Sequence, residues 1–413
     1  MEVSAASRPP IMAIRSPRLF LAVLAFSMSF ATASEFMVSA TLQSLAAAFQ
    51  SSSTEISWLL ASYALSYVLA APFLGYVSDR IDRVRLFRGA LFLFSLAEAG
   101  MALSPSISTA ISLRILSGMA SAALIPTSLV LITELFRPDK QTGAMGTVMF
   151  GVACGIAVGP ALAGILTDSL SWRAPFLMTS TGSVLCLGAS LFSMPTYSAR
   201  REPRHHSTTN WYANFRIVRP LLTRSACNGA GVSAFLISGE VLRWRYDLGA
   251  TEIGFTIMAF GLGIAAGNVS VGWLRRRCQS EENALALATI VLASAITAFM
   301  LTDKSLILSF FLMIFWGAAL GAIAPLNTVI LAARAGTDKG AALAFAETLD
   351  NIFVLVAVPI ITGVLMTGGA GPAMVAISIG LMLGISLALG DAFLTKKQRN
   401  SHQLPDKYNP LGE

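Results

Sequence analysis

Apolar residues in this chain fall in long blocks separated by short polar segments. Each block is roughly 20 residues long, the length that an α-helix needs to cross the hydrocarbon core of a bilayer. The pattern therefore predicts an all-α membrane protein with twelve transmembrane helices. The predicted spans are 18–40, 55–77, 87–104, 107–133, 143–167, 173–194, 220–242, 251–274, 283–302, 305–333, 340–367 and 371–394.

The longest polar segment divides the blocks six and six. It predicts an N-terminal six-helix bundle at 1–194, a cytoplasmic linker at 195–219 and a C-terminal six-helix bundle at 220–395. A cytoplasmic tail at 396–413 completes the chain, and we expect it to be disordered. A linker of this kind would let two bundles rock against each other. An ordinary long cytoplasmic loop is the alternative.

The composition agrees with a membrane protein. Hydrophobic residues make up 55% of the 413 positions and charged residues only 12%, about half the charge of a soluble domain. The net charge of +7 does not indicate a nucleic-acid partner, because the basic residues lie mostly on one side of the predicted spans. This asymmetry predicts that both termini are cytoplasmic. The Lys and Arg residues outside the cytoplasmic segments are Arg173, Arg243, Arg245 and Lys304 in outer loops, and Arg114 within a span.

Motifs for enzymatic chemistry are missing from the sequence. It has no phosphate-binding Gly-x-x-x-x-Gly-Lys segment, no metal-ligand cluster of His and Cys, and no nucleophile–base arrangement. None of its four cysteines falls in a predicted outer loop, so we expect no disulfide framework. The sequence therefore predicts no enzyme, no metal and no cofactor.

A basic turn follows the second apolar block. Its glycine would allow close helix contact, and an acid at the end of a helix can accept hydrogen bonds and pair with an arginine. A weaker echo without the acid, Gly272 to Arg277, follows the eighth block. The turn reads Gly75-Tyr76-Val77-Ser78-Asp79-Arg80-Ile81-Asp82-Arg83.

Two further patterns lie inside spans. In the fourth block Arg114 precedes Gly118 by four residues. An arginine inside a span costs several kcal/mol unless it faces a partner or water. Arg114 is therefore expected to face a central cavity; the alternative is a side chain that snorkels to the outer interface.

In the fifth block, small residues recur every four positions around a proline. Such glycines make a smooth helix face that another helix can approach closely. Generic packing of small residues is the alternative. The positions are Gly151, Gly155, Gly159, Pro160 and Gly164.

Together the three patterns resemble the major facilitator superfamily, in its twelve-helix drug:proton antiporter branch. The resemblance covers nearly the whole chain, and locally it extends to bacterial multidrug antiporters of the MdfA type. It implies that the glycine–proline pattern is the antiporter helix motif. Asp82 stands where the family usually has glycine, and Val84 replaces its second consecutive base. The residues that the resemblance identifies as a conformational switch are Gly75, Asp79, Arg80 and Arg83.

Glu35 lies in the second half of the first block, among apolar residues. Burial disfavours the charged form of a carboxylate, which suits it to bind and release protons. The resemblance implies that such an acid is the proton and cationic-drug site, and we expect Glu35 and Arg114 to couple transport to protons. The MdfA type has a second acid two turns earlier, where this chain offers only Ser27 and Ser29. An interfacial Glu35 at the outer helix end is the alternative.

Other residues are candidates for a substrate cavity. A largely apolar cavity with a few polar anchors is typical of small-molecule sites. Glu98 could be a second proton site, or it could lie near the outer interface or at a helix contact. Glu347 and Asp350 share one helix face and could pair with Arg334 or bind a cation; a structural role is the alternative. The candidate cavity residues are Phe30, Phe36, Tyr63, Tyr67, Asn228 and Asn327.

These features predict a monomeric antiporter in a bacterial inner membrane. It would use the proton as coupling ion and export small amphipathic compounds or drugs. Neutral or zwitterionic substrates are expected at least as much as cations, because the second acid is missing. Dedicated export of an endogenous metabolite, such as a siderophore or a signalling compound, is the alternative. A nutrient symporter is disfavoured by the glycine–proline pattern.

Overall fold

The computed structural model describes residues 16–78, 81–194, 214–302, 305–336 and 339–402. These residues form twelve α-helices joined by short connections. Helices of 20 to 33 residues are long enough to cross a bilayer at 1.5 Å per residue. Their bounds are α1 Pro17–Phe49, α2 Ser53–Ser78, α3 Arg83–Leu103, α4 Ile107–Leu135, α5 Pro138–Ser169, α6 Ala174–Ser193, α7 Phe215–Tyr246, α8 Ala250–Cys278, α9 Glu281–Leu301, α10 Leu306–Ala335, α11 Lys339–Gly368 and α12 Ala370–His402.

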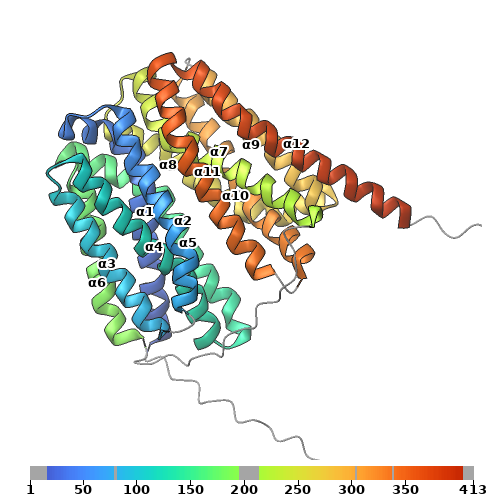
Figure 1. The fold of residues 1–413 in the computed structure, drawn as a ribbon, viewed down its shortest axis with the longest axis horizontal. Helices are drawn as coiled ribbons and strands as arrows, with labels where there is room; N and C mark the ends of the chain where they lie inside the picture. The colour runs from blue at the N-terminus through green and yellow to red at the C-terminus, as the bar shows by residue number, and fades with distance from the viewer. Residues whose placement is uncertain (1–15, 79–80, 195–213, 303–304, 337–338, 403–413) are drawn as a thin grey trace, which may run out of the picture.

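The helices form two sets, α1–α6 and α7–α12. We call the end of the molecule where α1 begins the proximal end, and the opposite end the distal end. The sets meet through α5 with α8, α2 with α11, and α1 with α7 and α8. Figure 1 shows the sets close together toward the distal end and spread apart toward the proximal end.

The contacts between the sets explain this shape. Gly164 of α5 lies against the backbone of Ala250, at the start of α8, and Gly254 lies against the backbone of Pro160. Farther from the distal end, Gly261 of α8 still packs against Ala157. Any larger residue at these positions would collide with backbone atoms of the neighbouring helix. Because glycine has no side chain, the two helices can approach closely here. The small residues thus fix the distal closure of the molecule.

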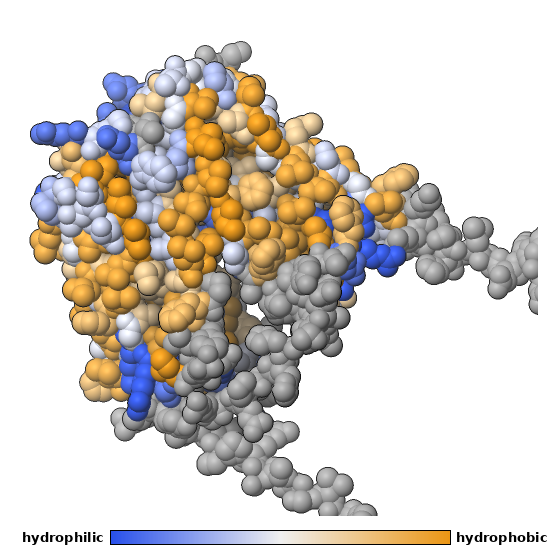
Figure 2. Space-filling model, in the orientation of Figure 1, coloured by the Kyte–Doolittle hydropathy of each residue, from blue (hydrophilic) through white to orange (hydrophobic). Residues whose placement is uncertain are grey.

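Ten of the helices are long and apolar enough to span a membrane. The exceptions within the described residues are α2, whose apolar stretch is Glu55–Ala71, and α7. Helix α7 carries arginines at both ends, but its residues from Thr223 to Leu242 are almost all buried among other helices. Figure 2 shows that much of the visible surface is apolar, as expected for a lipid-facing protein.

Several helices extend beyond the predicted spans. Helix α1 continues to Phe49, and α12 continues to His402 instead of giving way to a disordered tail at 396. Polar residues such as Lys, Gln and Arg favour helix, so leaving the apolar block does not end a helix. The predicted linker lies mainly outside the described residues, and α7 already begins at Phe215.

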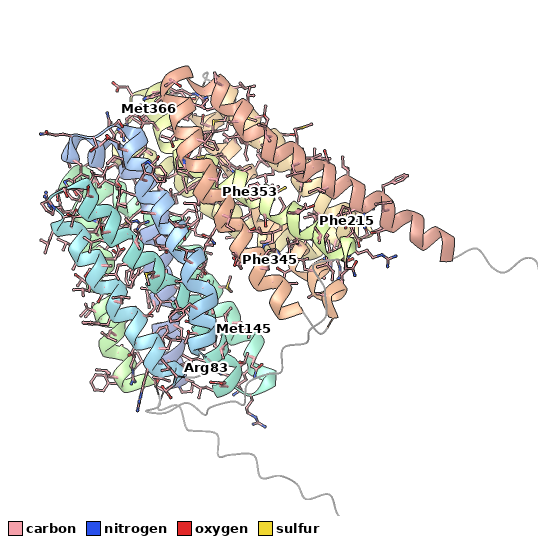
Figure 3. All side chains as sticks on the ribbon, viewed as in Figure 1. Arg83, Met145, Phe215, Phe345, Phe353 and Met366 are labelled. Carbon is pink, nitrogen blue, oxygen red and sulfur yellow. The ribbon has the colours of Figure 1, made fainter. Side chains whose placement is uncertain are left out.

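The proximal ends of the two sets carry matching ion pairs of opposite polarity. In the first set, Arg83 at the start of α3 pairs with Glu134, next to the last residue of α4. In the second set, Glu282 near the start of α9 pairs with Arg334, next to the last residue of α10, at 3.1 Å. Arg334 also contacts Asp391 of α12 at 2.8 Å. Figure 3 places Arg83 near the proximal end of the first set.

Candidate functional site

Glu35 lies near the middle of α1, and its side chain is half-buried. In the part of the chain that the structure describes, its carboxylate makes no hydrogen bond and no ion pair. At longer range it interacts electrostatically with Arg114 of its own set and with Glu347 of the opposite set. A carboxylate without a fixed partner is available to a proton or to a ligand, which makes Glu35 the centre of the candidate site.

Arg114 of α4 is enclosed inside the first set, with 1% of its surface exposed. Its Nη1 donates to the Ser34 hydroxyl at 2.9 Å and lies 3.8 Å from Oε1 of Glu98. Glu98 accepts hydrogen bonds from Ser34 at 2.8 Å and from Thr179 at 3.0 Å. Arg114 therefore neither faces an open cavity nor snorkels to an interface, because a buried carboxylate on α3 compensates its charge.

Helix α2 contributes the rest of the arginine's surroundings. The guanidinium of Arg114 lies 4.5 Å from the centre of the Tyr63 ring, and its Nε donates to the backbone oxygen of Leu59 at 3.3 Å. Tyr63 in turn interacts electrostatically with Glu35. Tyr63 thus packs against the arginine of the buried ion pair and is also within electrostatic range of Glu35.

A second charged cluster lies in the second set. The Nε–H of Arg224 on α7 donates a hydrogen bond to Asp350 of α11 at 3.1 Å. Arg224 also pairs with Glu347, which lies one helical turn before Asp350 on α11. Asp350 is buried, whereas 55% of the Glu347 side chain is exposed. These acids pair with Arg224 and not with Arg334. The sequence signals only that Arg224 lies within a predicted apolar block and needs a partner; it does not specify which acids pair with it.

Tyr67 lies within electrostatic range of acids from both sets. It is half-buried on α2 and interacts electrostatically with both Glu35 and Glu347. Asn228, also half-buried, lies one turn beyond Arg224 on α7. Of the predicted cavity residues, Tyr63 and Tyr67 are therefore the ones for which an electrostatic interaction with Glu35 is found.

Three predicted cavity residues have other packing partners. The Phe30 ring lies against Gly182 of α6, inside the first set. Phe36 packs on Phe235 of α7, with ring centroids 5.4 Å apart, in an aromatic cluster near the distal closure. Asn327 is fully buried and donates to the backbone oxygen of Pro220 at 2.8 Å, joining α10 to α7.

The glycine–proline pattern of α5 serves two helices at once. Gly151, Gly155 and Gly159 lie against the backbone of α1, within the turns that precede Glu35. Pro160 and Gly164 face α8 of the opposite set. The pattern therefore joins the helix of the candidate acid to the contact between the sets.

The predicted switch is described only in part. Gly75 belongs to the last turns of α2, and Arg83 pairs with Glu134. Asp79 and Arg80 lie outside the described residues. The part of the turn that is described thus includes an ion pair that joins α3 to α4.

An aspartate of the first set caps a helix of the second set at the distal end. Oδ2 of Asp168 accepts the backbone N–H of Thr251, the second residue of α8, at 2.7 Å. The N-cap residue of α8, Gly249, has no side chain for this purpose. The hydrogen bond spans the two sets, so it exists only while their distal ends are together.

Comparison with known proteins identifies the kind of molecule. A family model described as Major Facilitator Superfamily matches residues 24–302. The chain is 28% identical over 198 residues to the putative multidrug resistance protein MdtD of Pectobacterium carotovorum subsp. carotovorum (strain PC1), which covers 48% of this chain and 42% of that relative. It is 23% identical over 330 residues to multidrug resistance protein 3 of Bacillus subtilis (strain 168), covering 77% and 60%. The chain thus spans less than two thirds of the length of either relative.

A solved structure supports the same fold. It is that of a bacterial homolog to the human lysosomal transporter Spinster, in an inward-facing and unoccupied conformation. Its TM-score with this chain is 0.70 at 15% identity, covering 94% of this chain and 96% of that chain. At this identity the likeness concerns the fold alone.

Proposed function

Since the chain belongs to the major facilitator superfamily, we propose that it is a proton-coupled antiporter that exports small amphipathic compounds from the bacterial cytoplasm. Glu35 carries this proposal. It is a carboxylate in the middle of a membrane helix, without a hydrogen-bond or ion-pair partner among the described residues. Intramembrane acids of this kind mark proton and substrate pathways.

The neighbours of Glu35 suit a competition between a proton and a substrate. Arg114 is already compensated by Glu98, so it stabilises an ionised Glu35 only from a distance. Glu347 of the opposite set is paired with Arg224, so its charge too reaches Glu35 only from a distance. A proton, or a cationic or polar group of a substrate, can therefore bind at the Glu35 carboxylate, which has no fixed partner among the described residues.

Alternating access would follow from the arrangement of the two sets. With the N-terminus in the cytoplasm, the proximal end is cytoplasmic, and the observed arrangement corresponds to an inward-open state. A substrate would then enter between the sets from the cytoplasm. To release it outside, the distal contacts of α5 with α8 must open while the proximal ends approach each other.

Export is favoured over uptake by two observations. The glycine–proline face of α5 packs on both α1 and α8, so it links the acid-bearing helix to the contact that must open. Two relatives, 28% and 23% identical to this chain over the matched residues, are named multidrug resistance proteins, one of them putatively. The aromatic rings of Tyr63 and Tyr67 near Glu35 suit amphipathic molecules, which need apolar surface together with a polar anchor.

The decisive experiment compares Glu35→Gln with wild type in proteoliposomes under an imposed pH gradient. Uptake of a neutral drug such as chloramphenicol and of a lipophilic dye is measured, together with proton movement. We expect the variant to fold normally but to lose both gradient-driven transport and proton movement, because glutamine keeps the shape and cannot carry the charge. Glu55→Gln, at an exposed acid of α2, is the matched control and should behave as wild type.

Wild-type transport by Glu35→Gln would show that Glu35 is not the coupling residue. Proton movement by the wild-type protein without transport of any drug would favour dedicated export of an endogenous metabolite. Metabolite profiling of a deletion strain then identifies that compound. Transport into the cell along with protons would contradict export altogether.

A further inference from the structure

Helices α2 and α3 leave a groove between them on the first set, with α4 as its floor. Its volume is about 620 Å³. Several lining residues are large and exposed, including Phe73, whose exposed fraction is 64%. The main lining residues are Leu69 and Phe73 from α2, Gly89 and Leu93 from α3, and Ile115 and Met119 from α4.

The groove arises from how these helices pack. Both α2 and α3 pack on α4, but they make at most marginal contact with each other. The corresponding helices of the second set, α8 and α9, are in contact with each other as well as with α10. The groove is therefore a property of this half of the chain and not a general consequence of the fold.

The groove is apolar along its length and basic at its proximal mouth. Arg85 lies there, in the first turn of α3, with an exposed side chain. Asp82 caps this turn by accepting the backbone N–H of Arg85 at 2.8 Å, and in the described part of the chain the guanidinium of Arg85 has no partner. Arg88, one turn later, is already engaged, since it donates to Ser190 of α6. Arg85 is thus the arginine available to a ligand.

The depth of the groove matches one leaflet of a bilayer. From Arg85 to Leu93 the axis of α3 rises about 12 Å at 1.5 Å per residue. Half of the hydrocarbon core is about 15 Å thick. A molecule with its anionic head at Arg85 would therefore extend its chain along the groove to about the middle of the membrane.

From this match of shape, charge and depth we propose that the groove binds one anionic phospholipid. Its phosphate pairs with Arg85, and an acyl chain fills the space beside Gly89. Basic pockets between membrane helices are suited to anionic head groups, and the apolar walls of this one suit an acyl chain. This site lies apart from Glu35, and the proposal does not depend on the transport reaction.

The test measures lipid retention by native mass spectrometry of the full-length protein released from nanodiscs. The nanodiscs contain phosphatidylglycerol and phosphatidylethanolamine in equal amounts. Wild type is expected to retain one phosphatidylglycerol in preference to phosphatidylethanolamine. Arg85→Gln should weaken that preference about fivefold, since a basic residue near an anionic head group contributes roughly 1 kcal/mol.

A second variant tests the acyl part of the groove. A Cβ atom at Gly89 would meet no other atom within 4 Å, so the side chain of Gly89→Leu has room to enter the groove without displacing the backbone. It should fold, because leucine favours helix more than glycine, and it should lose the retained lipid. Gly272→Leu on α8, also in open space, and Arg276→Gln at the end of α8 are the matched controls and should retain it.

Undiminished retention by Gly89→Leu would overturn the proposal. Equal retention of the two lipids by wild type, or an unchanged preference in Arg85→Gln, would exclude the anionic head group. A wild-type protein that retains no phospholipid but forms a dimer in the nanodiscs would assign the groove to a second copy of the chain, and would likewise contradict a lipid site.

Discussion

The cap that Asp168 supplies to α8 should bias the protein toward its distally closed state. The perturbation is Asp168→Ala, which removes the acceptor of the Thr251 N–H and nothing buried. Loss of a helix cap costs typically about 1 kcal/mol. Because the two groups belong to different sets, this cost falls on the distally closed state and spares the open one. The ratio of open to closed molecules should therefore rise about fivefold.

Double electron–electron resonance measures this ratio directly. Spin labels at Leu170, beyond α5, and at Leu301, at the end of α9, report the distance between the sets at the distal end, and both positions are exposed. The four native cysteines are first replaced. In Asp168→Ala the population at the longer distance should grow by the stated factor.

Asparagine is the control that separates the hydrogen bond from the charge. It caps helices about as well as aspartate, so Asp168→Asn should keep the wild-type distances. If alanine leaves the distance distribution unchanged, the cap does not contribute to the conformational equilibrium. If asparagine opens the distal end as much as alanine, the charge and not the cap is responsible.

Three further predictions concern stability and packing. Glu98→Leu leaves Arg114 buried without a compensating charge and should lower the free energy of unfolding by about 3–5 kcal/mol, as measured by denaturant titration in detergent. An unchanged denaturation midpoint would mean that the Arg114–Glu98 pair is not formed. Gly155→Leu would drive a side chain into the backbone of α1 and should abolish the folded, monodisperse protein in size-exclusion chromatography, whereas Gly146→Leu on the same helix, in open space, should elute as wild type. Arg83→Glu and Glu134→Arg should each destabilise the protein by bringing like charges together, and the double variant should recover at least half of the loss in a double-mutant cycle.

The helices themselves were predictable because the bilayer demands a nearly fixed length of apolar sequence. The ends of the helices were not predictable. The bilayer requires apolar residues only within its hydrocarbon core, whereas a helix can continue beyond that core. Helix α12 illustrates this: it passes the last apolar block and runs through polar residues to His402. The close approach of α5 was also predictable, since glycines four residues apart can only form one smooth stripe.

The partners of the charged residues could not be read from the sequence. Arg224 and Asp350 are 126 positions apart, and nothing local to α7 or α11 specifies their contact. The direction in which a single side chain points from its helix could not be predicted either. Phe30 and Phe36 flank Glu35 in the sequence. In the folded helix, however, Phe30 packs against α6 and Phe36 packs against α7. Glu35, by contrast, could be singled out from the sequence alone, because a carboxylate within an apolar block is rare, and its role as the central acid stays a prediction.

The opposite polarity of the two proximal ion pairs bears on how the chain assembles as it enters the membrane. The two sets present similar helices to each other, and a newly inserted helix could pack in the wrong half. If α3 were to pack against α10, Arg83 would meet Arg334, and if α9 packed against α4, Glu282 would meet Glu134. Either mistake places like charges together near the membrane surface, which is an effective way to reject a wrong partner. The inverted pairs would therefore disfavour packing of a helix into the wrong half of the protein.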